Sequence, residues 1–387
     1  MNQKTEHIPV VIVGGGPVGL FLALCLLKQG IECRVLEKRE KPVPDSRSLG
    51  IHPPSLSLFD ELGITQTFLD QGIKISRGLA LSEHGKFGEI SFINLEATHP
   101  YILACPQFTT ESILRDELDR LDGSALITGV EFEGYKDTGE EVAVRYKTNH
   151  PKGEQQVISS RFLVGCDGKN SMVRQQAGIA FNGRRYPDTY IMGDFEDTTT
   201  FGNDAAVFLP KAGLIESFPL PNGMRRWVVK TVDYIAEPNA GLLAQKVKGR
   251  IGFDISDVRH TMLSSFGVQQ YMAETFQKGS VFLAGDAAHV VSPIGGQGMN
   301  LGWLDARALA DHLSDHLHQK TPGVNYTTQQ QHLVKKAARR AELNMRLGRK
   351  VSWPVFRNFA VKLMLSPILQ KKTAGMFTMQ NLEKGLI

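Results

Sequence analysis

Runs dominated by apolar residues mark four places along the chain, at residues 8–13, 33–36, 163–166 and 281–284. Each run is followed at once by glycine or an acidic residue, which is typical of strands buried on both faces of a parallel sheet. Residues 20–28 are apolar almost throughout and predict a buried helix after the first strand, with Gly30 as its stop. The pattern therefore predicts an α/β fold.

Between residues 179 and 277 the sequence contains short segments in which apolar and polar residues alternate. Short alternating segments at 190–195, 206–209, 214–219 and 226–232 are separated by Gly, Pro and Asn turns, which predicts antiparallel strands. Residues 79–93 predict further strands of the same sheet-rich domain. We therefore expect a discontinuous first domain from residues 1–72, 101–178 and 278–320. A sheet-rich domain would comprise residues 73–100 and 179–277, and helices would fill residues 321–387.

Weaker patterns complete the first domain. Residues 55–62 predict a short helix that ends at Gly63, and residues 109–121 predict a longer one with Thr109 and Thr110 as N-caps. Residues 125–130 and 142–146 predict further strands. Residues 8–27 resemble a membrane span in composition, but the glycines from Gly14 to Gly16 and then Pro17 break them into a strand and a helix that are each too short to cross a bilayer.

Length and charge narrow the class of protein. A chain of 387 residues suits two interlocked domains, and a net charge of +4 does not suggest a nucleic-acid partner. The four cysteines show no metal-ligand spacing, which favours reduced thiols, no metal site and a cytoplasmic protein. We find no signal peptide pattern at the start of the sequence.

The first chemical motif follows the first strand. Gly14, Gly16 and Gly19 fit G-x-G-x-x-G, and Glu37 ends the second predicted strand 21 residues after Gly16. The glycines permit a tight turn, close approach of a pyrophosphate and close helix–strand packing, while the acidic residue binds a ribose hydroxyl. The unit predicts dinucleotide binding. We expect the loop residues inside the motif to line the same site: Pro17 and Val18.

Two later segments carry similar chemistry. Asp286 follows the strand at 281–284, and a glycine-rich loop then leads into a helix that begins near Met299. A carboxylate at a strand end suits a polyhydroxylated ligand, and backbone N–H groups at a helix N-terminus suit an anionic or flat one. Asp167 and Gly168 form a sharp turn after the strand at 163–166, with Asn170 or Ser171 as a helix cap. Taken alone, either Asp is also explained as an ordinary turn or capping residue.

The three segments together resemble the class A FAD-dependent aromatic monooxygenases, with the para-hydroxybenzoate hydroxylase-like fold. The matching patterns are G-x-G-x-x-G, D-G-x-x-S-x-V-R and G-D-A-A-H…P…G-x-G-x-N, in the family's order. Gly16 and Asp167 are 151 residues apart, and Asp167 and Asp286 are 119 residues apart, as the family requires. The resemblance implies a Rossmann-type FAD-binding domain interleaved with a β-sheet-rich substrate domain, and a helical C-terminus.

The resemblance also implies roles for single residues. Asp286 would bind the ribityl chain, and the loop residues Gly296, Gly298, Met299 and Asn300 would lie along the pyrimidine edge of the flavin. Asp167 would lie near the pyrophosphate and serve both FAD and the reduced nicotinamide. Further FAD contacts would come from Arg47 on a mobile loop, from Gln107 at a helix start and from the backbone of Val130. The candidate catalytic residues are Arg47, His52 and Pro293.

His52 has two explanations from sequence. It is either a turn histidine before two prolines or a substrate-binding or proton-relay residue, and the sequence does not separate them.

The activity implied is hydroxylation of a small aromatic substrate through a flavin C4a-hydroperoxide, with FAD, NADH or NADPH, and O2. The protein would be a monomer or homodimer. A halogenase is disfavoured because Trp227, Trp303 and Trp353 are the only tryptophans and form no W-x-W-x-I-P motif. Two alternatives stay open: a membrane-associated ubiquinone-pathway or lipid-ring hydroxylase, and an FAD-binding protein that does not hydroxylate.

The C-terminal helices bear on the membrane alternative. Residues 332–349 predict a helix with six Lys or Arg and one acid, Glu342, which is either a solvated face or a membrane or partner contact. Pro354 starts a second helix with apolar residues at helical spacing. We expect this apolar face to close the core or the pocket rather than to bind lipid, and it comprises Phe356, Phe359, Ala360, Leu363, Met364 and Pro367.

Overall fold

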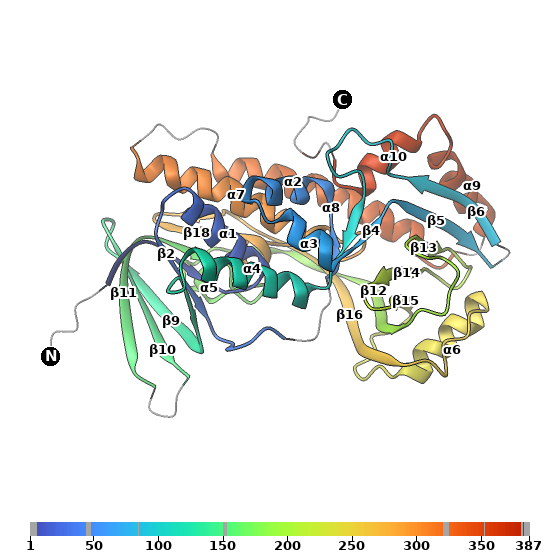
Figure 1. Ribbon diagram of the computed structural model, residues 1–387, viewed down its shortest axis with the longest axis horizontal. Helices are drawn as coiled ribbons and strands as arrows, with labels where there is room; N and C mark the ends of the chain where they lie inside the picture. The colour runs from blue at the N-terminus through green and yellow to red at the C-terminus, as the bar shows by residue number, and fades with distance from the viewer. Residues whose placement is uncertain are drawn as a thin grey trace.

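The structure is a computed structural model that describes residues 6–43, 48–83, 85–149, 153–319, 325–351, 353–380 and 382. Two large sheets lie one after the other along the long axis of the molecule, with helices packed over both (Figure 1). The predicted α/β architecture, with a Rossmann-type unit, a second sheet-rich part and a helical C-terminus, is confirmed.

The first sheet is parallel at its centre. Its strands follow the order β17-β18-β11-β1-β2-β8, and β1 pairs in parallel with both β2 and β11. The four predicted apolar runs all lie in this core, buried on both faces as their composition indicates. The strands of this path are β1 (Glu6–Val13), β2 (Cys33–Glu37), β8 (Leu126–Thr128), β11 (Gln155–Gly165), β17 (Gln277–Lys278) and β18 (Val281–Leu283).

The first sheet has an antiparallel extension whose strand boundaries differ from the prediction. The predicted strand at 125–130 is in fact β8 and the start of β9 (Val130–Asp137), separated at Gly129, whose φ of 67° ends the first strand. β9 pairs with β10 (Val142–Thr148), which pairs with the outer part of β11. That outer part begins with exposed or half-buried residues and includes Ser159 and Ser160, so apolar content alone revealed only the end of β11.

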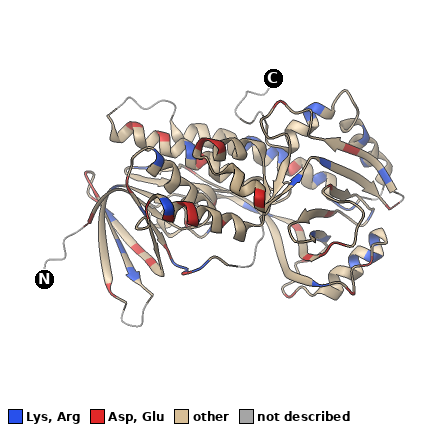
Figure 2. Ribbon diagram, in the orientation of Figure 1, with Lys and Arg blue, Asp and Glu red and all other residues tan. Residues whose placement is uncertain are grey.

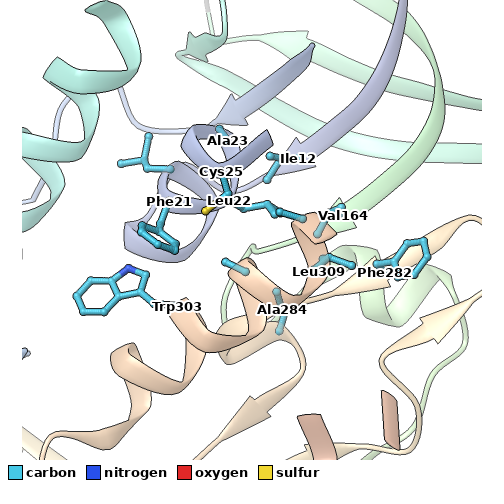
Figure 3. Close-up of a cluster of buried hydrophobic side chains, with 14 of the residues drawn as sticks. Ile12, Phe21, Leu22, Ala23, Cys25, Val164, Phe282, Ala284, Trp303 and Leu309 are labelled. Carbon is cyan, nitrogen blue, oxygen red and sulfur yellow. The ribbon is translucent and has the colours of Figure 1, made fainter. Parts of the chain in front are cut away.

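Helices α1 (Pro17–Lys28), α4 (Gln107–Leu121) and α7 (Gln297–Leu317) pack against this sheet. The close-up in Figure 3 shows side chains of α1 and α7 meeting with Ile12, Val164 and Phe282 of the strands. Trp303 of α7 donates its indole N–H to the carbonyl oxygen of Pro17, 3.0 Å away, which ties α7 to the N-terminal end of α1.

The N-terminus of α4 corrects one prediction. The helix begins at Gln107 with Pro106 as its N-cap, so Thr109 and Thr110 lie inside its first turn rather than at the cap. Pro106 adopts an extended backbone and Thr110 is fully buried, with its hydroxyl directed at the Cys105 sulfur. The N-terminal boundary of α4 therefore depends on the burial of Thr110, which the sequence alone does not reveal.

The second sheet is mostly antiparallel and has the order β19-β16-β12-β15-β14-β13-β5-β6. The four alternating segments are confirmed as strands of it, and residues 79–93 contribute two more. Its strands are β5 (Arg77–Ser82), β6 (Gly85–Ser91), β12 (Phe181–Glu196), β13 (Ala205–Phe208), β14 (Ile215–Leu220), β15 (Met224–Thr231), β16 (His260–Ala273) and β19 (His289–Val290).

Sequence analysis missed the two-residue strand β19 and two longer elements of this part. Helix α6 (Ala240–Ile251), capped by Asn239, covers one face of the sheet with Leu243, Ala244 and Val247. Strand β16 is fourteen residues long and pairs along almost the whole of β12. Glycine and polar residues interrupt the apolar pattern of both, so that neither stood out against the turns around them.

The remaining elements join the two halves. A small sheet contains β3 (Gly50–Ile51), β4 (Ile73–Ile75) and β7 (Ile102–Ala104) in the order β3-β7-β4. Short helices are α2 (Pro53–Leu62), α3 (Thr65–Gln71) and α5 (Met172–Gln176), and η1 (Gly285–Ala287) is a 3-10 turn. The C-terminal helices are α8 (Tyr326–Gly348), α9 (Pro354–Met364) and α10 (Gln370–Phe377). Helix α8 runs from the core of the first sheet to the second sheet, and α9 and α10 lie in the second half of the molecule (Figure 1).

The apolar face predicted for α9 is wrong. Phe356, Phe359 and Leu363 are 78%, 68% and 53% exposed, whereas Arg357 and Val361 are buried against the second sheet. The helix does border the interior, but through the face that carries these two residues and Met364, the one member of the predicted face that lines the described cavity. The Arg357 guanidinium donates to the main-chain carbonyls of Leu209 and Pro210, which explains why a charged side chain occupies the inner face.

Candidate functional site

One cavity of about 1400 Å³ lies between the first sheet's loops and the inner face of the second sheet. Pockets for a single small ligand measure roughly 300–1,000 Å³, so this space exceeds what one ordinary ligand fills. Most of the predicted site residues line it. They are Gly14, Gly16, Pro17, Val18, Glu37, His52, Gln107, Val130, Asp167, Asp286, Pro293, Gly296, Gly298 and Met299.

The first loop is arranged as a dinucleotide turn. A Cβ on Gly19 would lie 2.0 Å from the carbonyl oxygen of Gly14, so only glycine lets α1 approach β1 this closely. Gly19 thus acts in packing and is absent from the described cavity wall. A Cβ on Gly16 would meet nothing within 4 Å, which leaves its backbone open to a phosphate.

Glu37 is buried at the end of β2. One carboxylate oxygen accepts the backbone N–H of Gly15 at 2.7 Å, and the other accepts the backbone N–H and Nε of Arg39. The side chain therefore fixes the glycine loop as well as bordering the cavity. A ribose hydroxyl could be held at the same carboxylate, as the motif predicts.

Asp286 projects from η1 into the cavity, where the residue is exposed, and desolvation by the surrounding protein raises its pKa. Behind it lies a pair that sequence analysis did not identify. Asp305 of α7 is fully buried, and one of its oxygens lies 2.6 Å from Nε2 of His289 and accepts the backbone N–H of Gly285 at 3.0 Å. The pair holds the turn that presents Asp286.

The surroundings of the His289–Asp305 pair set the pKa of the histidine. Burial acts to lower the pKa of His289, but the Asp305 carboxylate outweighs it and the pKa stands above its ordinary value. An acid inside the otherwise apolar stretch of Trp303, Leu304 and Ala306 was the available signal for Asp305.

Asp167 caps helix α5. One of its oxygens accepts the backbone N–H of Met172 at 2.7 Å and of Val173 at 3.2 Å, while Ser171 caps the same helix through Arg174 N–H, as predicted. The other oxygen, Oδ1, is buried and has no hydrogen-bond partner among the described residues. Burial raises the Asp167 pKa. The free oxygen borders the cavity and is available to a polar ligand.

The glycine-rich loop ends in a helix start that borders the cavity. Gly296 has a left-handed backbone and is the N-cap of α7, whose first turn contains no acidic residue. The unpaired N–H groups and the helix dipole at this end favour negative charge. Gly298 and Met299 of the first turn border the cavity.

Asn300 lies behind this loop rather than on the described cavity wall. Its amide N–H₂ donates to the carbonyls of Gly50 and Gly296 at 2.8 Å, and its oxygen accepts from His52 N–H and Ser55 Oγ, also at 2.8 Å. Four hydrogen bonds use the whole side chain. Asn300 therefore fixes the loop to the β3–α2 segment, and its predicted direct contact with a cofactor stays a prediction.

His52 belongs to the same arrangement. Its Nε2 lies 3.1 Å from the carbonyl oxygen of Gly295, and because a carbonyl only accepts, this nitrogen carries the proton. Burial lowers the pKa of His52 to about 4, so the ring is neutral at physiological pH. Nδ1 has no partner among the described residues.

The remaining predicted residues fall around the rim. Gln107 begins α4 and donates to Glu111 at 2.9 Å, and the buried backbone of Val130 begins β9. Glu111, which sequence analysis did not identify, also lines the cavity, and burial raises its pKa. Pro293 precedes the glycine loop on the cavity wall. Arg47 lies outside the described residues.

These residues fit a flavin dinucleotide. One end of the cavity has the open Gly16 backbone for a pyrophosphate, the free Asp167 oxygen and the Asp286 carboxylate for polyhydroxylated groups, and the helix start of α7 for an electron-rich ring edge. The opposite end is apolar. It is walled by the second sheet and by the C-terminal helices, through Met192, Val207, Leu209, Leu214, Phe218, Val228, Leu347, Val361, Met364 and Leu365.

Comparison with known proteins agrees with this arrangement. Residues 7–341 match a family model described as an FAD binding domain. An uncharacterized aromatic compound monooxygenase of Bacillus subtilis is 34% identical over 314 residues, which is 80% of this chain and 61% of that protein. A rifampicin monooxygenase of Streptomyces venezuelae is 34% identical over 307 residues, 77% of this chain and 62% of that protein. The chain thus spans about three-fifths of the length of these relatives.

Among solved structures, p-nitrophenol 4-monooxygenase from Pseudomonas putida superposes with a TM-score of 0.88 over 99% of this chain and 100% of that one. Its sequence identity is 23%, so the likeness concerns the fold.

Proposed function

This chain belongs to the class A FAD-dependent aromatic monooxygenase family, and we propose that it hydroxylates an aromatic ring with FAD, NADH or NADPH, and O2. The observation that carries the proposal is the two-part cavity. A polar end built from three dinucleotide-type loops opens directly into an apolar chamber beneath the second sheet. FAD bound there would accept hydride from the nicotinamide and use O2 to place one oxygen atom on the substrate ring.

The chain's own residues then have distinct tasks. We assign the polar loops of residues 1–72, 101–178 and 278–320 to the cofactor, and the sheet of residues 73–100 and 179–277 to the substrate. Asp286 holds the polyhydroxylated chain, with the His289–Asp305 pair fixing its turn. The N–H groups at the start of α7 stabilise negative charge on the adjacent ring system. The apolar walls exclude water from the reacting centre.

Two measurements test the proposal. The purified, FAD-loaded protein is assayed for NADH and NADPH oxidation with phenols, aromatic acids, quinolones and polycyclic phenols, and products are analysed by mass spectrometry. We expect one class to stimulate oxidation and to yield a product one oxygen atom heavier. FAD binding without stimulation or product in any class would favour the non-hydroxylating alternative.

The cofactor site has a separate test. We expect Asp286→Ala to lose most of its bound FAD during purification, because the variant lacks the carboxylate that faces the polyhydroxylated chain. Flavin content equal to that of the wild type would contradict the assignment of Asp286.

The exposed face of α9 supports a second candidate, a hydroxylase that works at a membrane surface. Phe356, Phe359 and Leu363 lie on it, with Trp353 at 74% and Ile368 at 90% exposure next to it. Residues 343–382 contain seven Lys or Arg and no acidic residue, although Arg357 is buried and Arg349 is paired with Asp188. Figure 2 shows basic positions in blue on the C-terminal helices. Aromatic residues flanked by cations suit the surface of an anionic bilayer.

No helix in the described ranges combines the length and apolar character of a membrane span. Peripheral binding is tested by sedimentation with vesicles of phosphatidylcholine, with and without phosphatidylglycerol. We expect binding to the anionic vesicles alone and its loss in Phe356→Ser/Phe359→Ser. The matched control is Val232→Ser, which alters an exposed apolar residue outside these helices. Failure to sediment with anionic vesicles would remove this candidate.

A further inference from the structure

A single carboxyl group interrupts the apolar chamber. Glu216 is the second residue of β14, and its strand partners in register are Val207 of β13 and Val228 of β15. Continuing outward, Val207 pairs with Ala80 of β5, and Val228 pairs with Met192 of β12. All five residues line the cavity. Glu216 is therefore the one ionisable side chain in a row that crosses five strands.

Nothing in the described part of the chain neutralises this carboxylate. No hydrogen bond or ion pair of its side chain is present there, and burial alone raises the pKa of Glu216 to about 7. Arg226, which pairs in register with Phe218 two residues further along β14, also lines the cavity, but it makes a two-point contact with Asp194 through Nε at 2.6 Å and Nη2 at 2.8 Å. An uncompensated carboxyl in an apolar chamber costs stability, which indicates a role toward a ligand.

A second unpaired polar group lies close by. Tyr190 of β12 is buried, its hydroxyl has no hydrogen-bond partner among the described residues, and its ring stacks on Phe266 at 5.1 Å. Burial and then the charge of Glu216 raise the pKa of Tyr190, so its hydroxyl stays protonated. The region thus holds an acceptor and an undissociated hydroxyl, with no free cation on this row.

The chemistry of this part of the cavity wall determines which ring substituent it can bind. A carboxyl group accepts a hydrogen bond from a hydroxyl, and it repels a carboxylate. An aromatic acid would need a cation here, and the Arg226 guanidinium is already paired with Asp194. A neutral ring with a hydroxyl group satisfies Glu216 and fills the apolar wall at once.

We propose that Glu216 is the substrate-hydroxyl subsite of this cavity and that the chamber takes neutral hydroxyl-bearing rings rather than ring carboxylates. The inference rests on the proposed function and deepens it. In the bound state the ring hydroxyl donates to a Glu216 oxygen. When the proton moves to that oxygen, the phenolate keeps the electron pair, which raises electron density at the ortho and para carbons where an electrophilic oxygen would attach.

The test measures ring binding rather than turnover. FAD-loaded protein is titrated with 2-naphthol, 2-methoxynaphthalene and 2-naphthoate, and binding is followed through the flavin absorbance spectrum. We expect 2-naphthol to bind most tightly, and Glu216→Gln to weaken it about tenfold or more, because a hydrogen bond to a charged acceptor is lost. Glu216→Asp should recover part of the affinity. Glu196→Gln, at the exposed end of β12, is the matched control.

The pH profile separates a hydroxyl acceptor from a merely structural residue. Wild-type affinity for 2-naphthol should rise as pH rises through about 7, where Glu216 ionises, and the rise should be absent in Glu216→Gln. Equal binding of the three rings, unchanged affinity in Glu216→Gln, or no binding of 2-naphthol would each overturn the subsite. Glu216-dependent binding without an oxygenated product supports the subsite and counts only against the proposed hydroxylation.

Discussion

The neutral imidazole of His52 makes stability depend on pH. Its pKa is about 4 in the folded protein against 6.5 when exposed, so the unfolded chain takes up the proton first. The contribution of neutral His52 to the free energy of unfolding is complete above pH 6.5 and is lost as pH falls from 6.5 toward 4. Between pH 7.5 and pH 5 this amounts to about 2 kcal/mol of unfolding free energy. We expect urea unfolding of FAD-loaded protein to show that loss.

The control is His52→Gln, which keeps a side-chain donor for the Gly295 carbonyl and does not titrate. The difference in unfolding free energy between wild type and variant should shrink as pH falls from 7.5 to 5. Parallel pH curves for the two proteins would show that His52 is not the titrating group.

Gly19 has a purely steric task, and its replacement tests the first loop. A Cβ at this position would overlap the Gly14 carbonyl, and neither backbone is free to move in the buried α1–β1 contact. We expect Gly19→Ala to reduce bound FAD by about tenfold or more, as for a lost phosphate contact. Gly249→Ala is the control, because a Cβ in that position of α6 meets nothing within 4 Å. Flavin content is read from absorbance after gel filtration.

At this scale the sequence predicted residues that lie at the ends of strands or in glycine motifs. Glycine spacing and an acid after an apolar run are local signals, so Gly16, Glu37 and Asp286 could be placed on one cavity. Glu216 could not be assigned a role, although its neighbours at i±2, Leu214 and Phe218, share its face. Its role depends on which strands lie beside β14, and strand pairing cannot be deduced from the sequence of one strand alone.

At the scale of elements, α9 is held by a buried cation rather than by its apolar face. Arg357 donates to two main-chain carbonyls beyond β13, and Arg357→Met would leave both carbonyls without that donor at a cost of roughly 1–3 kcal/mol each. We expect α9 to detach locally and its amides to exchange faster in hydrogen–deuterium exchange mass spectrometry. Lys362→Met, on the exposed side of the helix, should leave exchange unchanged. Unaltered protection of α9 in Arg357→Met would contradict this anchoring.

Helix α9 also explains why apolar periodicity misled at this scale. A helical stripe of Phe and Leu predicts a buried face only where apolar surface is always buried in the protein. Here the stripe faces outward, and an arginine with carbonyl partners occupies the interior. The buried elements of the first sheet were predicted well because both their faces are covered, so that their apolar content has one explanation.

Across the whole molecule, one buried carboxylate connects the C-terminal helices to the second sheet. Asp188 of β12 is 2% exposed at its side chain and contacts Lys230 of β15 at 2.6 Å and Arg349 after α8 at 2.7 Å. Burial acts to raise its pKa, but hydrogen bonds from Arg349 and Lys230 outweigh this and the pKa lies below its ordinary value. The ion cluster therefore stays formed at neutral and mildly acidic pH. Asp188 and Arg349 are 161 residues apart in sequence, so their pairing was beyond sequence reasoning.

Replacement of Asp188 by Asn should show how much this connection matters. The variant keeps the side-chain volume but leaves two cations with reduced compensation, and breaking a buried ion pair costs about 3–5 kcal/mol. We expect the unfolding free energy to fall by that order and the apolar chamber to loosen, because Leu347 and Gly348, which directly precede Arg349, border it. Asp254→Asn removes the carboxylate of an exposed ion pair with Lys248 and should not change the unfolding transition measurably. Equal transitions for the two variants would mean that α8 is held to the sheet by its apolar contacts alone, such as Met345 against the cluster around Tyr190.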